Sequence, residues 1–189
     1  GLKQLAPVAQ ARENPVYQLN TAFLADGAVI TVAAGAKPVR PLHLRFVGTG
    51  DAPFSTATRV LVQLGEGAEF SLLESHEGTD GLTCQPNDAL DVVVGPKAAF
   101  RHTRLNIEGD ATIALSTLSL KVEAEGQVET VNLVTGAVLS RHQIFVHIAG
   151  EDTNVVVNGA AMLRRGQLAD STLLADHAAV GGVGREQFK

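Results

Sequence analysis

The chain has 189 residues, of which 45% are hydrophobic and 19% charged, so it is long and apolar enough for one packed domain and is not intrinsically disordered. Its net charge of −5, its 4% aromatic content and the lack of a Lys/Arg run make nucleic acid and anionic membranes poor partners. A single cysteine excludes an internal disulfide framework, and no apolar run reaches the roughly 18 residues of a membrane span.

Residues 1–16 are expected to form a lead-in segment, because Pro7 and Pro15 break any helix there. From Tyr17 to Lys189 the sequence consists of short runs rich in Val, Ile, Thr and Leu, separated by glycine-bearing turns. Such runs have the length and composition of β-strands. In chain order they are residues 28–32, 43–47, 59–64, 69–75, 90–94, 99–107, 112–122, 128–134, 144–148 and 154–157.

The turns recur at a regular spacing, which predicts the fold class. One glycine per turn gives a spacing of about 14 residues, so that every second turn recurs after about 28. A β-sandwich also has closely spaced turns, but several turns here share a Gly-x-Gly-Ala-like sequence pattern. Stacked coils would require the same backbone conformation, and hence a similar pattern, in each coil. We therefore predict an all-β, parallel β-helix (β-solenoid) with two main sheets over residues 17–189. The glycines are Gly67, Gly81, Gly95, Gly109, Gly126, Gly136 and Gly150.

The segment ESHEG contains His76 between Glu74 and Glu77, which are the ingredients of a metal site or an acid–base pair. It lies where a strand enters a turn, and no further His or Cys follows at ligand spacing. We therefore interpret it as a solvated turn. The neighbouring loop GEGAEF lacks the lysine and the following helix of a phosphate-binding loop, and is interpreted as a turn.

The other histidines lie mainly on predicted strands. Alternation places His102 on one face with Phe100 and Arg104, and we expect this face to be an outer sheet surface or a partner contact. In the segment SRHQIFVHI, His142 and His147 fall on opposite faces, and the pattern leaves their environments open.

Two further candidates are His177 and Cys84. His177 follows Asp170 and Asp176, and one histidine with one carboxylate is more often a structural hydrogen-bonded pair than a site. Cys84 has no Lys, Arg or His beside it to lower its pKa, so we expect an unreactive thiol.

Several segments of the sequence together resemble the SufB/SufD family of iron–sulfur cluster assembly proteins, and the SufD branch more closely. The resemblance covers nearly the whole chain from Tyr17 to Lys189. It rests on NTAFLADGAVITV, LHLRFVG, RVLVQLGEGAEFSLLES, GPKAAFRHTRLNIEG, GAVLSRHQIFVHIAGEDTNVVVNGAAML and the later ADSTLLADH…REQFK.

This resemblance implies a right-handed β-helix core and a non-enzymatic scaffold that works with a SufB-type partner and a SufC-type ATPase. The helical regions that flank the core in the family, including the C-terminal one that contacts SufC, have no counterpart in these residues. The chain begins without methionine, and we expect a cytoplasmic core fragment. By the resemblance, His177 and Lys189 match family positions, an iron–sulfur cluster is present only transiently in the full complex, and the fragment alone binds no cofactor.

An open final coil would also allow a homodimer, because unpaired strand edges favour self-association. Two alternatives of other classes remain: a β-solenoid enzyme acting on carbohydrates, and a purely structural solenoid. A carbohydrate enzyme needs paired carboxylates and aromatic platforms in one groove, whereas the chain has no Trp and one Tyr. Two carboxylates beside aromatic side chains in a groove would favour the enzyme.

Overall fold

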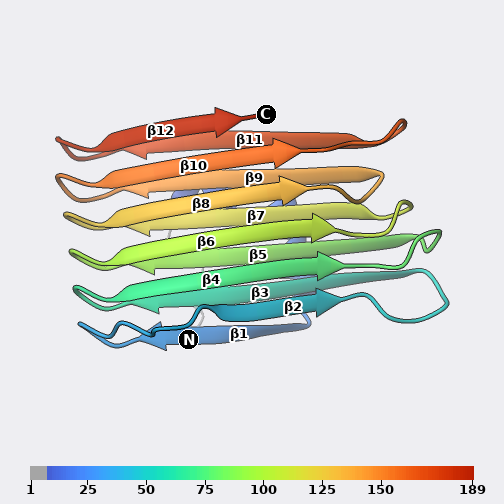
Figure 1. Cartoon of the computed structure of the whole chain (residues 1–189), viewed down its shortest axis with the longest axis horizontal. Coiled ribbons are helices and arrows are strands. Elements are labelled where there is room, and N and C mark those ends of the chain that lie inside the picture. The colour runs from blue at the N-terminus through green and yellow to red at the C-terminus, as the bar shows by residue number, and fades with distance from the viewer. Residues whose placement is uncertain (1–7) are drawn as a thin grey trace.

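The computed structural model describes residues 8–189, and its strands form a right-handed parallel β-solenoid (Figure 1). Each sheet has six strands, and every neighbouring pair is parallel. The predicted fold class, an all-β parallel β-helix with two main sheets, is confirmed. One sheet contains β1 (Asp26–Val32), β3 (Phe54–Leu64), β5 (Cys84–Val94), β7 (Ile113–Val122), β9 (Leu139–Ile148) and β11 (Leu168–His177); the other contains β2 (Leu42–Val47), β4 (Glu69–Glu77), β6 (Ala99–Ile107), β8 (Gln127–Val134), β10 (Asn154–Ala161) and β12 (Val183–Phe188).

The register of the sheets confirms the predicted repeat. Val62 pairs with Val92, and Val92 pairs with Leu120, so one coil takes 92 − 62 = 30 and then 120 − 92 = 28 residues. Each coil contributes one strand to each sheet, which explains why turns recur at half this period. The chain climbs by one strand spacing per coil from β1 at one end to β12 at the other (Figure 1).

One corner of the solenoid repeats the same backbone conformation at successive coils. Gly67 has a positive φ of 64°, and Lys97, Glu125 and Asp152 adopt it at equivalent places with φ of 58°, 59° and 54°. Each donates its N–H to a carbonyl of the next coil, as from Gly67 to Pro96 at 2.9 Å. Glycine therefore favours this corner without being required at every level, because the hydrogen-bond ladder offsets the strain of the left-handed conformation.

An apolar core fills one half of the lumen between the sheets. Val62, Val92 and Leu120 are each 0% exposed and lie directly above one another. Phe70 and Phe100 from the opposite sheet belong to the same core cluster, with ring centroids 6.4 Å apart. Since a single coil cannot bury both of its sides, this stack stabilises all coils together.

The first described residues are helical, which corrects the expected lead-in. The helices are α1 (Ala9–Glu13) and α2 (Pro15–Phe23), so the boundary expected at Tyr17 falls inside α2, and the first strand begins only at Asp26. Pro15 starts α2 because its missing N–H is not needed in the first helical turn, and the Asn14 side chain caps the helix by accepting from Val16 and Tyr17. Residues 1–7 of that predicted segment lie outside the described residues.

Helix α2 packs on the outer face of the odd-numbered sheet, against β3, β5 and β7. The side chain of Arg59 donates to Asn20 Oδ1 at 2.7 Å and lies over the Tyr17 ring, whose hydroxyl donates to Asp91 at 2.8 Å. Burial, followed by the negative charge of Asp91, raises the pKa of Tyr17 far above its usual value. In residues 8–189, no helix has the length and hydropathy needed to cross a membrane.

Candidate functional site

The second half of the lumen is polar and buried. In β4 and β6, alternation turns Glu74, His76, His102 and Arg104 inward, and their exposed fractions are only 1–4%. The parallel register sets Glu74 beside Arg104, while Asp88 reaches the same space from β5 in the opposite sheet. Charged side chains are seldom buried unless they are paired, so this cluster is the candidate functional site.

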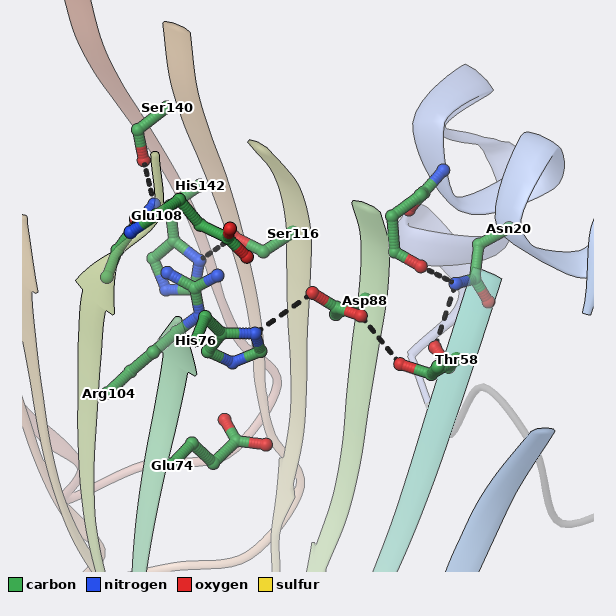
Figure 2. A network of polar contacts seen from close by, with 12 residues as sticks. Asn20, Thr58, Glu74, His76, Asp88, Arg104, Glu108, Ser116, Ser140 and His142 are labelled. Atoms are coloured by element: carbon green, nitrogen blue, oxygen red, sulfur yellow. Dashed lines mark hydrogen bonds and ion pairs between the residues drawn. The ribbon is translucent and has the colours of Figure 1, made fainter. Parts of the chain in front are cut away.

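One line of contacts crosses the lumen from sheet to sheet. Nδ1 of His76 lies 3.0 Å from Oδ2 of Asp88, and the hydroxyl of Thr58 donates to Oδ1 of the same carboxylate at 2.6 Å. Figure 2 shows these contacts running from His76 through Asp88 to Thr58. The His76 ring also stacks on Phe46, with centroids 4.6 Å apart. The imidazole is thus fixed by an aromatic ring and by a carboxylate.

A second line runs along the even-numbered sheet. Nε2 of His102 is 2.9 Å from Oε2 of Glu74, and Nδ1 is 2.9 Å from the hydroxyl of Thr130. Three successive coils therefore share one hydrogen-bonded chain. In a dry interior such a chain is strong when every member is satisfied, and costly when one member is removed.

Further polar contacts extend this network to β7, β8 and β9. The guanidinium of Arg104 contacts Oδ1 of Asn132 at 3.4 Å, and the Asn106 amide donates to Ser140 at 3.0 Å. Ser116 and Nδ1 of His142 lie 2.7 Å apart (Figure 2). The polar half of the lumen therefore spans several coils.

The two paired carboxylates are held in their charged form. For Glu74, burial is the largest influence and raises the pKa, but the hydrogen bond and charge of His102 lower it overall. For Asp88, burial again acts upward, while His76 and Thr58 bring the pKa below its usual value. Both carboxylates are therefore ionised at neutral pH and need their partners.

The basic residues of the cluster differ in whether they carry a charge. Burial lowers the pKa of Arg104, an effect that the charges of nearby carboxylates oppose, and the guanidinium stays charged. Burial and then the charge of Arg104 hold the pKa of His142 well below its usual value, so this imidazole is neutral at neutral pH. Arg104 is the residue of the cluster that carries a positive charge at every accessible pH.

A cavity of about 10 Å³ lies among these side chains, which is roughly the space of one water molecule. Nε2 of His76 and Nε2 of His142 are buried and have no hydrogen-bond partner among the described residues. Both histidines line this cavity. It can therefore accept one small polar species as a hydrogen-bond partner.

A larger pocket of about 150 Å³ adjoins this cavity and shares Phe46, Thr58 and Asp88 with it. Thr56, Cys84 and Glu108 complete its polar lining. Burial, followed by the charge of nearby Asp88 acting in the same direction, keeps the pKa of Glu108 above its usual value despite opposing positive charges. The polar lumen therefore has an acidic pocket at the end where β5 begins.

The substitution Glu108→Gln is expected to stabilise the protein at pH 7–8 by less than about 1 kcal/mol. A raised pKa in the folded state contributes stability below the unfolded pKa, and that contribution is lost as pH rises through the folded pKa. Glutamine removes the penalty of ionising Glu108, so the gain should shrink towards pH 4. Urea midpoints at pH 4, 7 and 8 measure this, and a difference that does not change with pH would contradict it.

Within residues 8–189, no group of three or more His, Cys, Asp or Glu side chains is arranged to hold a metal ion. The contacts that are present are ion pairs and hydrogen bonds between coils. Chemically, the arrangement can order a small polar species inside the solenoid and can hold charges at fixed positions. It also links five or more strands through side chains.

The interpretation of ESHEG as a solvated turn is wrong. His76 is 1% exposed and Glu74 4% exposed, because both fall on inward positions of β4. Of the three residues, Glu77 alone points outward, where it accepts from Arg45 at 2.7 Å and has a pKa of about 2 owing first to that hydrogen bond. The strand continues to Glu77, two residues beyond the predicted end at residue 75.

The expectation for His102 is also corrected. Phe100, His102 and Arg104 do share one face, as alternation predicted, but that face is the lumen and not the outside of the sheet. His142 likewise lies inside, whereas His147 lies outside and contacts Asp176 at 2.8 Å.

The two family-matched positions lie on the last coil. Asp176 is bound to His147, and Asp170 pairs with Arg141 at 2.7 Å, so neither carboxylate orients His177 in the way the sequence suggested. His177 pairs in register with the buried Ile148 and is exposed. Lys189 is exposed at the end of the chain, and its backbone N–H donates to Gly159.

Cys84 starts β5 and is buried. Burial raises the pKa of its thiol, which lowers the fraction of reactive thiolate. Its side chain lines the acidic pocket with Asp88 and Glu108. The sequence analysis considered only the residues beside Cys84 in the chain, so it did not connect the thiol with Glu108.

Sequence reasoning missed Asp88 and the polar residues of β7 and β8. A signal was present in the spacing: Glu74 and Arg104 are 104 − 74 = 30 residues apart, close to one coil, and therefore had to be neighbours in a parallel sheet. The alternation of residues did not show whether the face of β6 that carries Arg104 points into the lumen or towards solvent. Both faces of β6 carry apolar and polar residues, as in AFRHTRLNI.

Comparison with known proteins supplies an independent line of evidence. Residues 46–189 match the family described as SUF system FeS cluster assembly, SufBD core domain. The chain is 32% identical over 171 residues to Protein ABCI7, chloroplastic, of Arabidopsis thaliana, covering 85% of this chain and 36% of that protein. It is 26% identical over 176 residues to an iron-sulfur cluster assembly SufBD family protein of Synechocystis, covering 87% and 39%, and 22% identical over 151 residues to iron-sulfur cluster assembly protein SufD of Escherichia coli, covering 78% and 36%. The chain thus spans less than two fifths of each of these relatives.

Proposed function

The chain belongs to the family of SufBD core domains of the SUF iron–sulfur cluster assembly system, and we propose that it is a non-catalytic, SufD-type scaffold of a cluster assembly complex. The observation that carries this is the extent of the family match. It begins in β2 and continues to the last residue, so it includes the polar lumen and the final coil. Iron–sulfur cluster assembly is therefore the process in which we place this chain.

The SufD-type assignment is supported by the cysteine content. The chain has one cysteine, and Cys84 is buried with a raised pKa. Clusters are held by several thiolates, so a sister subunit richer in cysteine is the better candidate to carry them. On this proposal a cluster is present only transiently in the whole complex, and this segment holds none by itself.

The last coil offers the surface for a SufB-type partner. β11 and β12 each end a sheet, so each presents one edge that pairs with no other described strand. Leu168, Val183 and Phe188 are 59%, 46% and 43% exposed there. A free edge next to exposed apolar side chains favours strand addition by another chain. We propose that a SufB-type subunit covers this coil, and that a second copy does so when no partner is present.

His177 and Lys189 fit this proposal by position. His177 occupies the lumen side of β11, in register with Ile148, and is exposed because no further described coil lies above it. Lys189 closes the same coil. A subunit docked on this coil would therefore contact both residues, and we propose that they belong to that interface.

The remaining parts of the proposal concern the whole complex. We place the contact with a SufC-type ATPase in a longer chain that continues beyond Lys189. A cytoplasmic location is likewise proposed, although one relative bears the name chloroplastic. Both points are open to test with a full-length protein.

The substitution Phe188→Glu is expected to weaken binding of a purified SufB-type partner by more than tenfold, because it places a charge in the apolar part of the interface. Phe188 is 43% exposed and the monomer should fold normally. The control is Val29→Glu, the same kind of change on β1 at the opposite end, where Val29 is 70% exposed. Titration calorimetry gives both affinities. Unchanged binding by Phe188→Glu, or an equal loss in Val29→Glu, would argue against docking on the last coil.

The carbohydrate-enzyme alternative gains little support from the acidic pocket. Asp88 and Glu108 do meet there beside Phe46 and Phe54. However, the pocket measures about 150 Å³, below the roughly 300 Å³ of ordinary ligand pockets. Asp88 is also engaged by His76 and Thr58, which leaves one carboxylate where a glycosidase needs two.

A further inference from the structure

The acidic pocket at the start of β5 combines an apolar wall with a negative floor. Phe46, Phe54 and Pro86 supply the wall, and Asp88 and Glu108 supply the charge. No Lys, Arg or His is among the residues that line it. A pocket of this kind attracts a cation that also carries apolar surface, because the carboxylates favour the charge and the rings favour both the hydrocarbon and the charge.

Glu108 shows that the charge of the pocket is incompletely matched. Its exposed fraction is only 8%, yet neither of its carboxylate oxygens accepts a hydrogen bond from a described residue; its closest polar relations are the charges of His76, Asp88 and Arg104. A mostly buried carboxylate that meets no protein donor relies on solvent or a ligand for its hydrogen bonds. A donor-bearing cation in the pocket would supply them.

The wider cluster leads to the same expectation. Three carboxylates, those of Glu74, Asp88 and Glu108, face one permanent cation, Arg104. His76 and His102 add positive charge only in their protonated form. The cluster therefore has fewer positive than negative charges. Glu74 and Asp88 have partners that lower their pKa values, whereas the pKa of Glu108 is raised. Glu108 is thus the carboxylate whose charge is least well compensated.

The occupancy of Asp88 distinguishes an organic cation from a metal ion. One oxygen of Asp88 lies 3.0 Å from Nδ1 of His76, and the other accepts a hydrogen bond from Thr58. Glu108 is therefore the carboxylate of this pocket that can bind a ligand. A metal ion would need several oxygen or sulfur ligands at short range. An ammonium group needs only a few acceptors, and its alkyl chain can lie against Phe46 and Phe54.

We propose that this pocket binds an alkylammonium group, namely the end of a lysine side chain presented by a partner protein. The volume of about 150 Å³ matches the roughly 150 Å³ cavity that accepts a benzene-sized guest, which is close in size to a butylammonium group. The ammonium lies against Glu108, and the alkyl chain contacts Phe46 and Phe54, which line the same pocket. Cys84 forms part of the same wall and reports on occupancy.

The test is a titration of the isotopically labelled chain with n-butylammonium chloride, followed by the amide signals of Gly48 and Cys84, at constant ionic strength. Saturable shifts are expected at these two residues. Binding should fall at least tenfold for the neutral analogue n-butanol and for Glu108→Gln. The control variant Glu129→Gln removes a charge from an exposed position on β8 and should bind as the wild type does.

The outcomes that would overturn the proposal are distinct. Equal binding of n-butanol would show an apolar pocket without charge recognition, and stronger shifts with Mg²⁺ or Zn²⁺ would show a metal site. Spermidine binding tenfold tighter than Nα-acetyl-lysine methylamide would point to a free polyamine in place of a protein lysine. Absence of saturable shifts at 100-fold excess of every probe would remove the site altogether. None of these results depends on whether the last coil binds a SufB-type subunit.

Discussion

Replacing His102 with leucine is expected to lower the free energy of unfolding by about 3–5 kcal/mol, because the substitution leaves a buried carboxylate without its partner. His102 bonds Glu74 at 2.9 Å on one side and Thr130 at 2.9 Å on the other. Glu74 is only 4% exposed. Urea unfolding followed by circular dichroism measures the loss, with hydrogen exchange on β4 and β6 to show where it is felt.

The double variant Glu74→Leu/His102→Leu separates the pair from its surroundings. Removing both partners should cost less than the sum of the two single changes, because no unpaired charge then remains between these positions. Arg101→Leu, on an exposed position of the same strand, controls for leucine on β6. A loss below about 1 kcal/mol for His102→Leu would mean that Glu74 does not depend on this contact.

The two ionised carboxylates of the polar lumen, Glu74 and Asp88, give the protein a defined acid sensitivity. Glu74 and Asp88 both have lowered pKa values in the folded protein, against the upward effect of burial. Their contribution to stability is therefore present above the unfolded pKa, near 4, and is lost as pH falls through the folded values. Losing His102 should flatten this dependence on the acid side, since Glu74 no longer has its hydrogen bond.

Phe100→Ala is expected to cost about 3–5 kcal/mol, as for other buried aromatic truncations. Phe100 is 1% exposed and is stacked between Phe70, at 6.4 Å, and His102, at 5.9 Å. It therefore supports both halves of the lumen, and its loss leaves a cavity next to a polar network. Thermal and urea unfolding give the magnitude.

The control for Phe100→Ala is Ile107→Ala, on the same strand but 39% exposed, which should cost less than about 1 kcal/mol. Because coils touch only their neighbours, the loss of protection should be strongest in β4, β6 and β8 and should fade towards both ends. A uniform loss over all coils, or equal costs for the two substitutions, would contradict this description of the core.

The fold could be predicted from the sequence because its repeat leaves a mark in every coil. Turns at about 14-residue spacing are the direct result of two corners per coil of 28–30 residues, as in the pairing of Val62, Val92 and Leu120. The start of the chain was less accessible. Pro15 interrupts a helix in its interior but begins one at its first position, and Asn14 decides between the two by capping.

The candidate site was predicted poorly for a physical reason. Alternation shows which residues of a strand share a face, as for His102 and Arg104, but it does not show which face is inside when both carry polar residues. The usual rule that charges lie outside then gave the wrong direction. Burial of His76 and Arg104 is made possible by Asp88 and Glu74, and these partners come from other coils, so no local segment contains the whole network.

The central claim, that this chain is a scaffold of a cluster assembly complex, is tested most directly by anaerobic co-purification with SufB-type and SufC-type partners. The chain is compared with a version that continues beyond Lys189. The account predicts that both versions retain the SufB-type partner through the last coil, and that only the extended one also retains the SufC-type ATPase. Failure of both versions to retain any partner would contradict the account.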